Sequence, residues 1–207
     1  DLWGGTNYPA VALIKGPVSG DYDVYDAGAT LYGADGYANH RVHSGLDLDG
    51  DGATEVIYGE GWTYGTSADH TGNVAVFGGG SGWTGNRALS EADYLWTGPT
   101  EESYLGTQIS GGDVDGDGRD DLVLVAWGEG TGGDWAGATY VLMGDNLPPS
   151  GEISWDARIV GDKAYDRLGR GGVPVVADLD DDGDADLAVS SHYTDRVLLF
   201  LDAAGLG

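Results

Sequence analysis

The chain has 207 residues, 35 acidic and 9 basic side chains, and a formal net charge of −26 at pH 7. This charge excludes nucleic acid and anionic membrane surfaces as favoured partners, because they carry the same sign, and it favours divalent cations. The absence of cysteine excludes a disulfide framework and a thiolate metal site, and no apolar run approaches the roughly 18 residues of a membrane span. The chain is 41% hydrophobic, with 7 Trp and 12 Tyr, which argues against an acidic disordered chain.

Short strands are the predicted elements along the whole chain. Segments of about four to seven residues, rich in Val, Ile, Leu, Tyr and Trp, are bounded by Gly, Asp or Asn. The segment from Ser90 to Trp96 is compatible with one helical turn, but its phase with the other strands favours a strand. In chain order the predicted strands lie at 10–16, 29–33, near Val42, at 54–59, 73–79, 94–98, near Ile109, at 121–126, 138–144, 157–161, near Val175, and at 186–190 and 196–202.

The elements repeat. Three Asp-rich loops begin at Asp47, Asp113 and Asp178, which are 66 and 65 residues apart. The strands predicted at 73–79 and 138–144 keep the same phase, and Leu-Gly pairs precede the second and third loops. We therefore expect a single repeat domain over 1–207. Its repeats lie at about 10–72, 73–137 and 138–195, and 196–207 begins a further repeat.

Each repeat contains four predicted strands: one before the Asp-rich loop, one after it, and two more. Four-stranded units of this length favour β-propeller blades over a β-sandwich or a parallel β-helix. A propeller usually needs about four to eight blades, whereas this chain supplies about three. The predicted fold class is therefore all-β, with propeller-type repeats of about 65 residues, in an incomplete ring or in one completed by other copies.

The Asp-rich loops follow the pattern D-x-D-x-D-G-x-x-[D/E], which predicts a cation site. Carboxylates at positions 1, 3 and 5 converge if the loop curls, the glycine at position 6 permits the sharp turn, the carbonyl at position 7 faces inward, and the acid at position 9 closes the shell. Hard oxygen ligands in this number fit Ca²⁺ better than Mg²⁺. The expected ligands are Asp47, Asp49, Asp51, Ala53 and Glu55 in the first loop, Asp113, Asp115, Asp117, Arg119 and Asp121 in the second, and Asp178, Asp180, Asp182, Asp184 and Asp186 in the third.

Two other interpretations of the loops are weaker. An EF-hand needs a bidentate Glu at position 12 and flanking helices, but position 12 is Tyr58, Leu124 or Val189, each in a predicted strand. Asp-rich turns that bind no metal would account for one such loop. Three matching loops in phase make that alternative much less favourable.

The loops, the strands after them and the Leu-Gly pairs before them resemble the FG-GAP repeats of integrin α-subunit propellers and their bacterial relatives. The resemblance implies blades of four antiparallel strands, with about three Ca²⁺ ions in the hairpin loops between the first two strands of each blade, and an extracellular or cell-surface protein. No repeat keeps the Phe-Gly pair. The Gly-Ala-Pro turn is replaced by 58–60, 126–128 and 190–192.

The sequence lacks a catalytic constellation, and we expect no enzyme activity. His40 and His43 are spaced to lie on opposite faces of a strand, and Ser190-Ser191-His192 lacks the elbow context of a serine nucleophile. Aromatic residues in or beside Gly-rich connections are expected to pack between blades, with stacking on sugars as the alternative. These residues are Trp62, Tyr64, Trp83, Trp127, Trp135 and Tyr193.

Three functions are compatible with these features. The leading hypothesis is a calcium-binding module for cell adhesion or for recognition of a protein or glycan. The second is a structural subunit that self-associates through its terminal strands, because open strand edges pair readily. The third is an accessory domain of a larger secreted enzyme. None of the three requires nucleic acid or membrane insertion.

Overall fold

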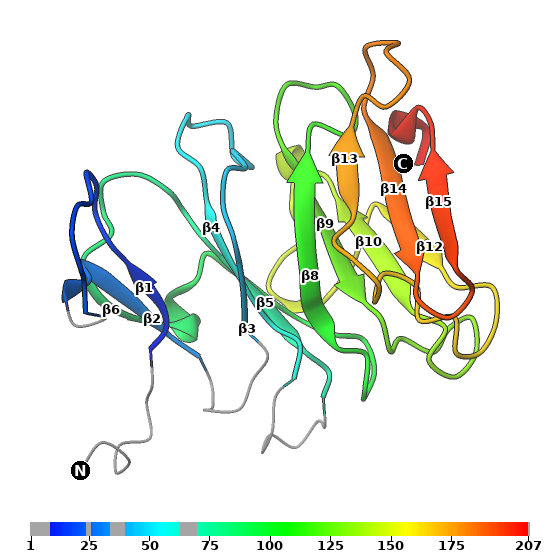
Figure 1. Ribbon diagram of the computed structural model, residues 1–207, viewed down its shortest axis with the longest axis horizontal. Helices are drawn as coiled ribbons and strands as arrows, with labels where there is room; N and C mark the ends of the chain where they lie inside the picture. Colours follow the sequence, from blue (N-terminus) through cyan, green and yellow to red (C-terminus); the bar gives the residue numbers. More distant parts are fainter. Residues whose placement is uncertain (1–8, 24–25, 34–39, 63–69, 207) are drawn as a thin grey trace.

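The computed structural model describes residues 9–23, 26–33, 40–62 and 70–206. These residues form four β-sheets that follow one another along the chain and lie side by side (Figure 1). The first sheet contains β1 (Pro9–Leu13), β2 (Ala29–Tyr32) and β6 (Gly85–Ala88). The second contains β3 (His40–His43), β4 (Val56–Glu60), β5 (Asn73–Phe77), β7 (Tyr94–Thr97) and β11 (Gly151–Glu152). The third contains β8 (Leu105–Gly112), β9 (Asp121–Ala126), β10 (Ala138–Leu142) and β12 (Ala157–Val160), and the fourth contains β13 (Val175–Ala177), β14 (Asp186–Ser191) and β15 (Arg196–Phe200).

The all-β fold class with propeller-type repeats is confirmed. In the second and third sheets, four consecutive strands pair antiparallel in the expected order, as β3–β4–β5–β7 and β8–β9–β10–β12. The fourth sheet has the first three strands of this pattern. The first strands β3, β8 and β13 contact one another in succession, as expected where consecutive sheets share an inner side.

Two short strands were not predicted. Strand β6 lies in the connection from β5 to β7, and β11 lies in the connection from β10 to β12. Each pairs in parallel with a strand of the preceding sheet, β6 with β2 and β11 with β7. These pairs therefore tie consecutive sheets together at their outer edges.

The segment from Ser90 to Trp96 combines both structures that its sequence allows. Residues Leu89–Glu91 form a single 3-10 turn, and β7 begins at Tyr94. Two further 3-10 turns, Gly144–Asn146 and Ala203–Leu206, follow β10 and β15. No described helix is long or apolar enough to cross a membrane.

The hydrophobic core lies between consecutive sheets. Leu31 and Phe77 pack between the first and second sheets, Ile57 and Leu124 pack between the second and third, and Val123 packs between the third and fourth. All six residues of β9 are buried, because this strand has a neighbouring sheet on each face. Burial of each such side chain contributes about 1.5–3 kcal/mol, so the inter-sheet contacts stabilise the array.

The Leu-Gly pairs mark a close approach between sheets. Gly106 and Gly169 have φ of +84° and +80°, in the left-handed region that favours glycine. A Cβ atom at Gly106 would lie 2.7 Å from the backbone oxygen of Asn73, and one at Gly169 would lie 2.5 Å from a methyl group of Val125. The preceding leucines, Leu105 and Leu168, are buried. The pair therefore anchors the start of each new sheet against the previous one.

Candidate metal centre

The three acidic loops lie at the same end of three sheets. Each joins the first strand to the second, β3 to β4, β8 to β9 and β13 to β14. In the third sheet the pairing runs from Leu105 opposite Ala126 to Gly112 opposite Asp121, which places the loop beyond the second of these pairs. The same three loops rise above the sheets in Figure 1. The position-12 residues lie inside β4, β9 and β14, which confirms that these loops are not EF-hands.

The loops share one backbone curl, which their own side chains hold in place. The amide of the position-6 glycine donates to the position-1 carboxylate at an N–O distance of 3.0 Å in all three loops. These glycines, Gly52, Gly118 and Gly183, have φ of +86°, +94° and +99°. The position-5 carboxylate accepts from the position-7 amide at 2.7, 2.8 and 3.0 Å. The curl is therefore encoded within the loop itself.

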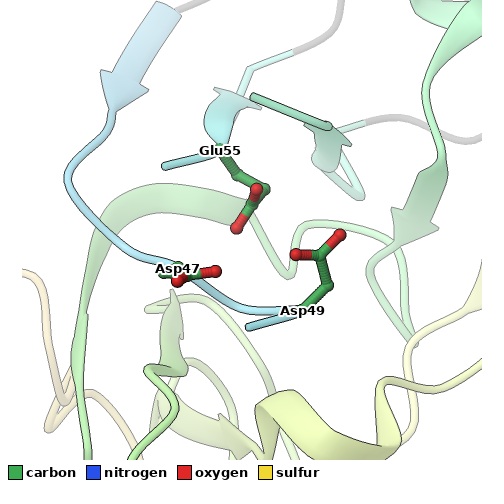
Figure 2. Close-up of side chains that lie close together, drawn as sticks. All are labelled: Asp47, Asp49 and Glu55. Atoms are coloured by element: carbon green, nitrogen blue, oxygen red, sulfur yellow. The ribbon is translucent and has the colours of Figure 1, made fainter. Parts of the chain in front are cut away.

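The curl brings the carboxylates at positions 1, 3 and 9 together. One oxygen from each of these residues lies within 4.8 Å of the others in every loop. Figure 2 shows the first group, where the carboxylates of Asp47, Asp49 and Glu55, the residue just before β4, converge on a common space. The groups are Asp47, Asp49 and Glu55; Asp113, Asp115 and Asp121; and Asp178, Asp180 and Asp186.

The acid at position 9 is buried and organises the loop. Glu55, Asp121 and Asp186 are at most 3% exposed. Each accepts a hydrogen bond from the amide of the position-2 residue, at 2.6 Å from Leu48, 2.7 Å from Val114 and 2.7 Å from Leu179. This contact ties the beginning of the loop to the beginning of the second strand.

The position-9 acid also contacts the end of the third strand of its sheet. Asp121 Oδ1 accepts from the Gly144 amide at 2.9 Å, and Asp186 Oδ1 accepts from the Asp202 amide at 3.1 Å. Gly144 and Asp202 follow β10 and β15 closely. The carboxylate therefore links the first, second and third strands of the sheet at one point.

The grouped carboxylates are electrostatically unfavourable without a counter-charge. Burial raises the pKa of Asp121 to about 6, and the nearby charge of Asp115 contributes in the same direction. Burial also raises the pKa of Glu55, with further contributions from Asp49 and Asp47. The pKa of Asp180 is raised, first by desolvation and then by neighbouring carboxylates. The sites therefore disfavour their own charged form.

The residues fit a hard divalent cation. Asp113 Oδ1 is buried and accepts no hydrogen bond. Among the described residues, none of the nine grouped carboxylates forms an ion pair with a basic side chain. Buried carboxylate oxygens without partners are costly, and several oxygen ligands around one point are what Ca²⁺ requires. A bound Ca²⁺ ion would supply the missing positive charge.

Metal binding by all fifteen expected ligands stays a prediction, and six of them lie outside the three groups. The position-5 carboxylates of Asp51 and Asp117 lie outside the grouped side chains, and Asp182 instead lies with Asp184 and Asp202 in an exposed group. The expected carbonyl ligands are those of Ala53, Arg119 and Asp184.

Two acidic residues near the loops were missed from the sequence. Asp120 links the first two loops, because its Oδ2 accepts from the Asp47 amide at 2.8 Å and its amide donates to the Asp47 carbonyl at 3.2 Å. The adjacent acids Asp120 and Asp121 were the sequence feature that could have indicated this contact. Asp202 is equivalent in the repeat to Gly79 of the second sheet and Gly144 of the third. Because neither glycine has a carboxylate, the repeat pattern did not predict an acid at this position.

No described histidine belongs to the acidic groups. His40 interacts with the Tyr58 hydroxyl at the far end of the second sheet. Trp127 is buried, which confirms the expected packing for this residue, whereas Tyr193 is 59% exposed. Tyr64 lies outside the described residues.

Comparisons with known proteins bear on one repeat. The family model described as the FG-GAP repeat matches residues 105–142, which run from the start of β8 to the end of β10 and include the whole second acidic loop. No curated protein matches the chain. The FG-GAP resemblance expected from the sequence is therefore confirmed for residues 105–142, and the repeat of which they are part is similar to the β-propeller-type FG-GAP repeats.

Proposed function

We propose that the three acidic loops each bind one Ca²⁺ ion and that the chain is a calcium-stabilised recognition module of an extracellular or cell-surface protein. The observation that carries this proposal is the recurrence of three convergent carboxylates at the same place in three consecutive sheets. The FG-GAP match over residues 105–142 supports the extracellular setting, which is typical of such repeats. The module recognises a protein or glycan and performs no catalysis.

Calcium in this proposal acts on stability. The position-9 acids join strands of one sheet, and Asp120 joins the first loop to the second, so a cation at these loops would hold consecutive sheets in place. With a dissociation constant of roughly 0.1 mM, about 1 mM Ca²⁺ stabilises the folded state by about 1.4 kcal/mol per site. Recognition surfaces on other connections would then be presented on a rigid frame.

Equilibrium dialysis with radioactive Ca²⁺ tests the metal assignment. We expect three ions per chain in the wild type and two ions in each of Asp49→Asn, Asp115→Asn and Asp180→Asn, with Mg²⁺ competing weakly. Asp93→Asn is a suitable control, because this acid lies outside the loops and bonds the Gly78 amide. Binding of fewer than one ion per chain at about 1 mM Ca²⁺ would overturn the proposal.

Self-assembly is a second candidate function, favoured by the outer face of the fourth sheet. Val197, Leu199 and Leu201 are 63%, 59% and 53% exposed there, and β15 has no fourth strand beside it within the described residues. Such an edge and face favour pairing with a second copy. Sedimentation velocity in Ca²⁺ tests this candidate. We expect association that Leu199→Asp abolishes and that the control Val18→Asp, at an exposed valine far from β15, leaves intact. A monomer at all concentrations would remove it.

A further inference from the structure

An aromatic–arginine cluster lies at the end of the sheets opposite the acidic loops. The third sheet begins at this end with Leu105 opposite Ala126, and the fourth sheet has Ser191 opposite Arg196 there. The cluster comes from the segments before β8 and β13 and from the β9–β10 and β14–β15 connections. Its members are Tyr104, Trp127, Trp135, Arg167, Arg170 and Tyr193.

Trp127 is the fixed centre of the aromatic–arginine cluster. It is 5% exposed, and the Tyr104 ring stacks on one of its faces at 4.2 Å between centroids and 5° between planes. Trp135 packs against it edge to face at 5.6 Å, and its indole N–H donates to Glu102. The tryptophans therefore form a rigid support.

Two arginines lie against this support. The Arg170 guanidinium is 4.5 Å from the centroid of Trp127, and that of Arg167 is 5.7 Å from the same ring. Because Tyr104 covers one face of Trp127, Arg170 lies over the other. Arg167 also lies 4.7 Å from the centroid of Trp135 and 4.5 Å from that of Tyr193.

The two arginines have no carboxylate in ion-pair contact among the described residues. Neither forms an ion pair within the described part of the chain, although their neighbours Lys163 and Arg196 pair with Asp166 and Asp162. The Nε of Arg167 is buried and donates no hydrogen bond, whereas its Nη1 donates to the Tyr193 hydroxyl at 3.2 Å. In a chain of net charge −26, two guanidinium groups beside one ring without a carboxylate partner are suited to bind an anion.

The surroundings narrow the class of anion. Tyr193 is 59% exposed beside Arg167, so an aromatic face is available next to the positive charge. On another side of Trp135, a hollow of about 450 Å³ is lined by Glu101, Glu102 and Asp134, which repel an anion and restrict it to the arginines. A sugar ring that carries one carboxylate and has an apolar C–H face suits an exposed aromatic ring and a guanidinium pair, whereas the net charge of the chain disfavours a long polyanion.

We propose that the aromatic–arginine cluster binds an acidic saccharide, with the carboxylate of a uronic acid on Arg167 and Arg170 and the sugar ring against Tyr193. This inference rests on the proposed recognition function and names its ligand class and its surface. The cluster lies away from the acidic loops, so the saccharide does not depend on Ca²⁺ as a bridging ligand.

Isothermal titration calorimetry in about 2 mM Ca²⁺ tests the proposal. The probe is a hyaluronan hexasaccharide, which carries glucuronic acid, and the neutral comparison is chitohexaose. We expect binding of the acidic probe at least tenfold tighter than of the neutral one. Arg167→Gln and Arg170→Gln are each expected to weaken acidic binding at least tenfold, and Tyr193→Ala about fivefold, because each removes one bidentate charge contact or one stacking face.

A matched control is available in the first sheet. Arg87 also lies over a tryptophan, 5.0 Å from the Trp83 centroid, and forms no ion pair among the described residues, so Arg87→Gln removes a similar arginine without touching the cluster. We expect it to bind the probe as the wild type does. Arg170→Lys keeps a cation over Trp127 and tests whether loss of binding reflects loss of structure; weaker binding with an unchanged near-ultraviolet circular dichroism spectrum supports a direct contact.

Several results overturn the inference. The first two are equal affinity for both saccharides and wild-type binding in both single variants, Arg167→Gln and Arg170→Gln. The other two are binding of aspartate-rich peptides in place of saccharides and no binding of any probe. A melt of the same samples with and without Ca²⁺ separates the two proposals. A Ca²⁺-dependent midpoint without saccharide binding rejects only the saccharide site, whereas no response to Ca²⁺ rejects the proposed metal function.

Discussion

The second and third acidic loops share three internal hydrogen bonds but lie in different surroundings. In both, the position-9 acid bonds the position-2 amide at 2.7 Å and the position-6 amide bonds the position-1 acid at 3.0 Å. The position-2 side chain is 1% exposed for Val114 and 47% exposed for Leu179. The second loop borders a following sheet, whereas the third loop has none within the described residues. Local sequence therefore sets the curl, and the next sheet sets the burial.

The same contrast extends along the strands. Val141 in β10 and Leu199 in β15 hold the same register position, opposite Val123 and Ala188 on the second strands. Val141 is buried against the fourth sheet, and Leu199 is 59% exposed. The two sheets thus offer matched positions at which the contribution of a neighbouring sheet can be measured.

The largest effect is expected where a buried acid serves several backbone donors. Asp121→Ala leaves the amides of Val114, Asp115 and Gly144 without their acceptor and should lower the free energy of unfolding by about 3–5 kcal/mol. Asp186→Ala affects fewer and more exposed donors and should cost about 1–2 kcal/mol. Urea denaturation in Ca²⁺ measures both, and equal losses would contradict the role given to the following sheet.

The position-2 leucines sharpen the comparison because they have the same side chain. Leu48 is 1% exposed in the first loop and Leu179 is 47% exposed in the third. Leu48→Ala should cost about 2–4 kcal/mol, whereas Leu179→Ala should change the free energy of unfolding by less than about 0.5 kcal/mol. The test is the urea midpoint of each variant, compared with that of the wild type at an unchanged m-value. A large loss for Leu179→Ala would mean that the third loop is covered in solution.

A valine pair tests the strands in the same way. Val141→Ala removes methyl groups from the core between the third and fourth sheets and should cost about 1–2 kcal/mol. Val197→Ala, on the outer face of the fourth sheet, should change the free energy of unfolding by less than about 0.5 kcal/mol. Thermal melts at several protein concentrations decide the matter, since a concentration-dependent loss for Val197→Ala would reveal a covering partner.

A further effect concerns the pH dependence of stability in the metal-free protein. The pKa of Asp121 is about 6 in the folded state and about 3.9 in an unfolded chain, so the folded state binds its proton more tightly. The stability contributed by the protonated acid is present below about pH 4 and is lost as the pH rises towards about 6. In EDTA, the urea midpoint of the wild type should fall more steeply between about pH 4 and pH 6 than that of Asp121→Asn. Parallel curves of midpoint against pH for the two proteins would contradict the burial of the Asp121 carboxylate.

The sequence predicted features that arise within a few residues. The loop curl follows from Asp and Gly at fixed positions, and the strands follow from short apolar runs bounded by Gly and Asp. The parallel pairing of β6 and β11 escaped prediction because strands this short carry little pattern and their partners lie in another sheet. The contact of Asp202 with Asp186 also escaped prediction, because the two residues are distant in sequence. Arg167 and Arg170 contact Trp127 only through the packing of the fourth sheet on the third, which the sequence pattern does not specify.

The most direct test of the calcium sites is the thermal midpoint of the wild type and of the triple variant Asp49→Asn, Asp115→Asn, Asp180→Asn, each in EDTA and in about 1 mM Ca²⁺. Three sites that each stabilise by about 1.4 kcal/mol should raise the wild-type midpoint by roughly 8 °C or more. The triple variant should show little change between the two conditions. A wild-type midpoint that is the same in EDTA and in Ca²⁺ would contradict the account.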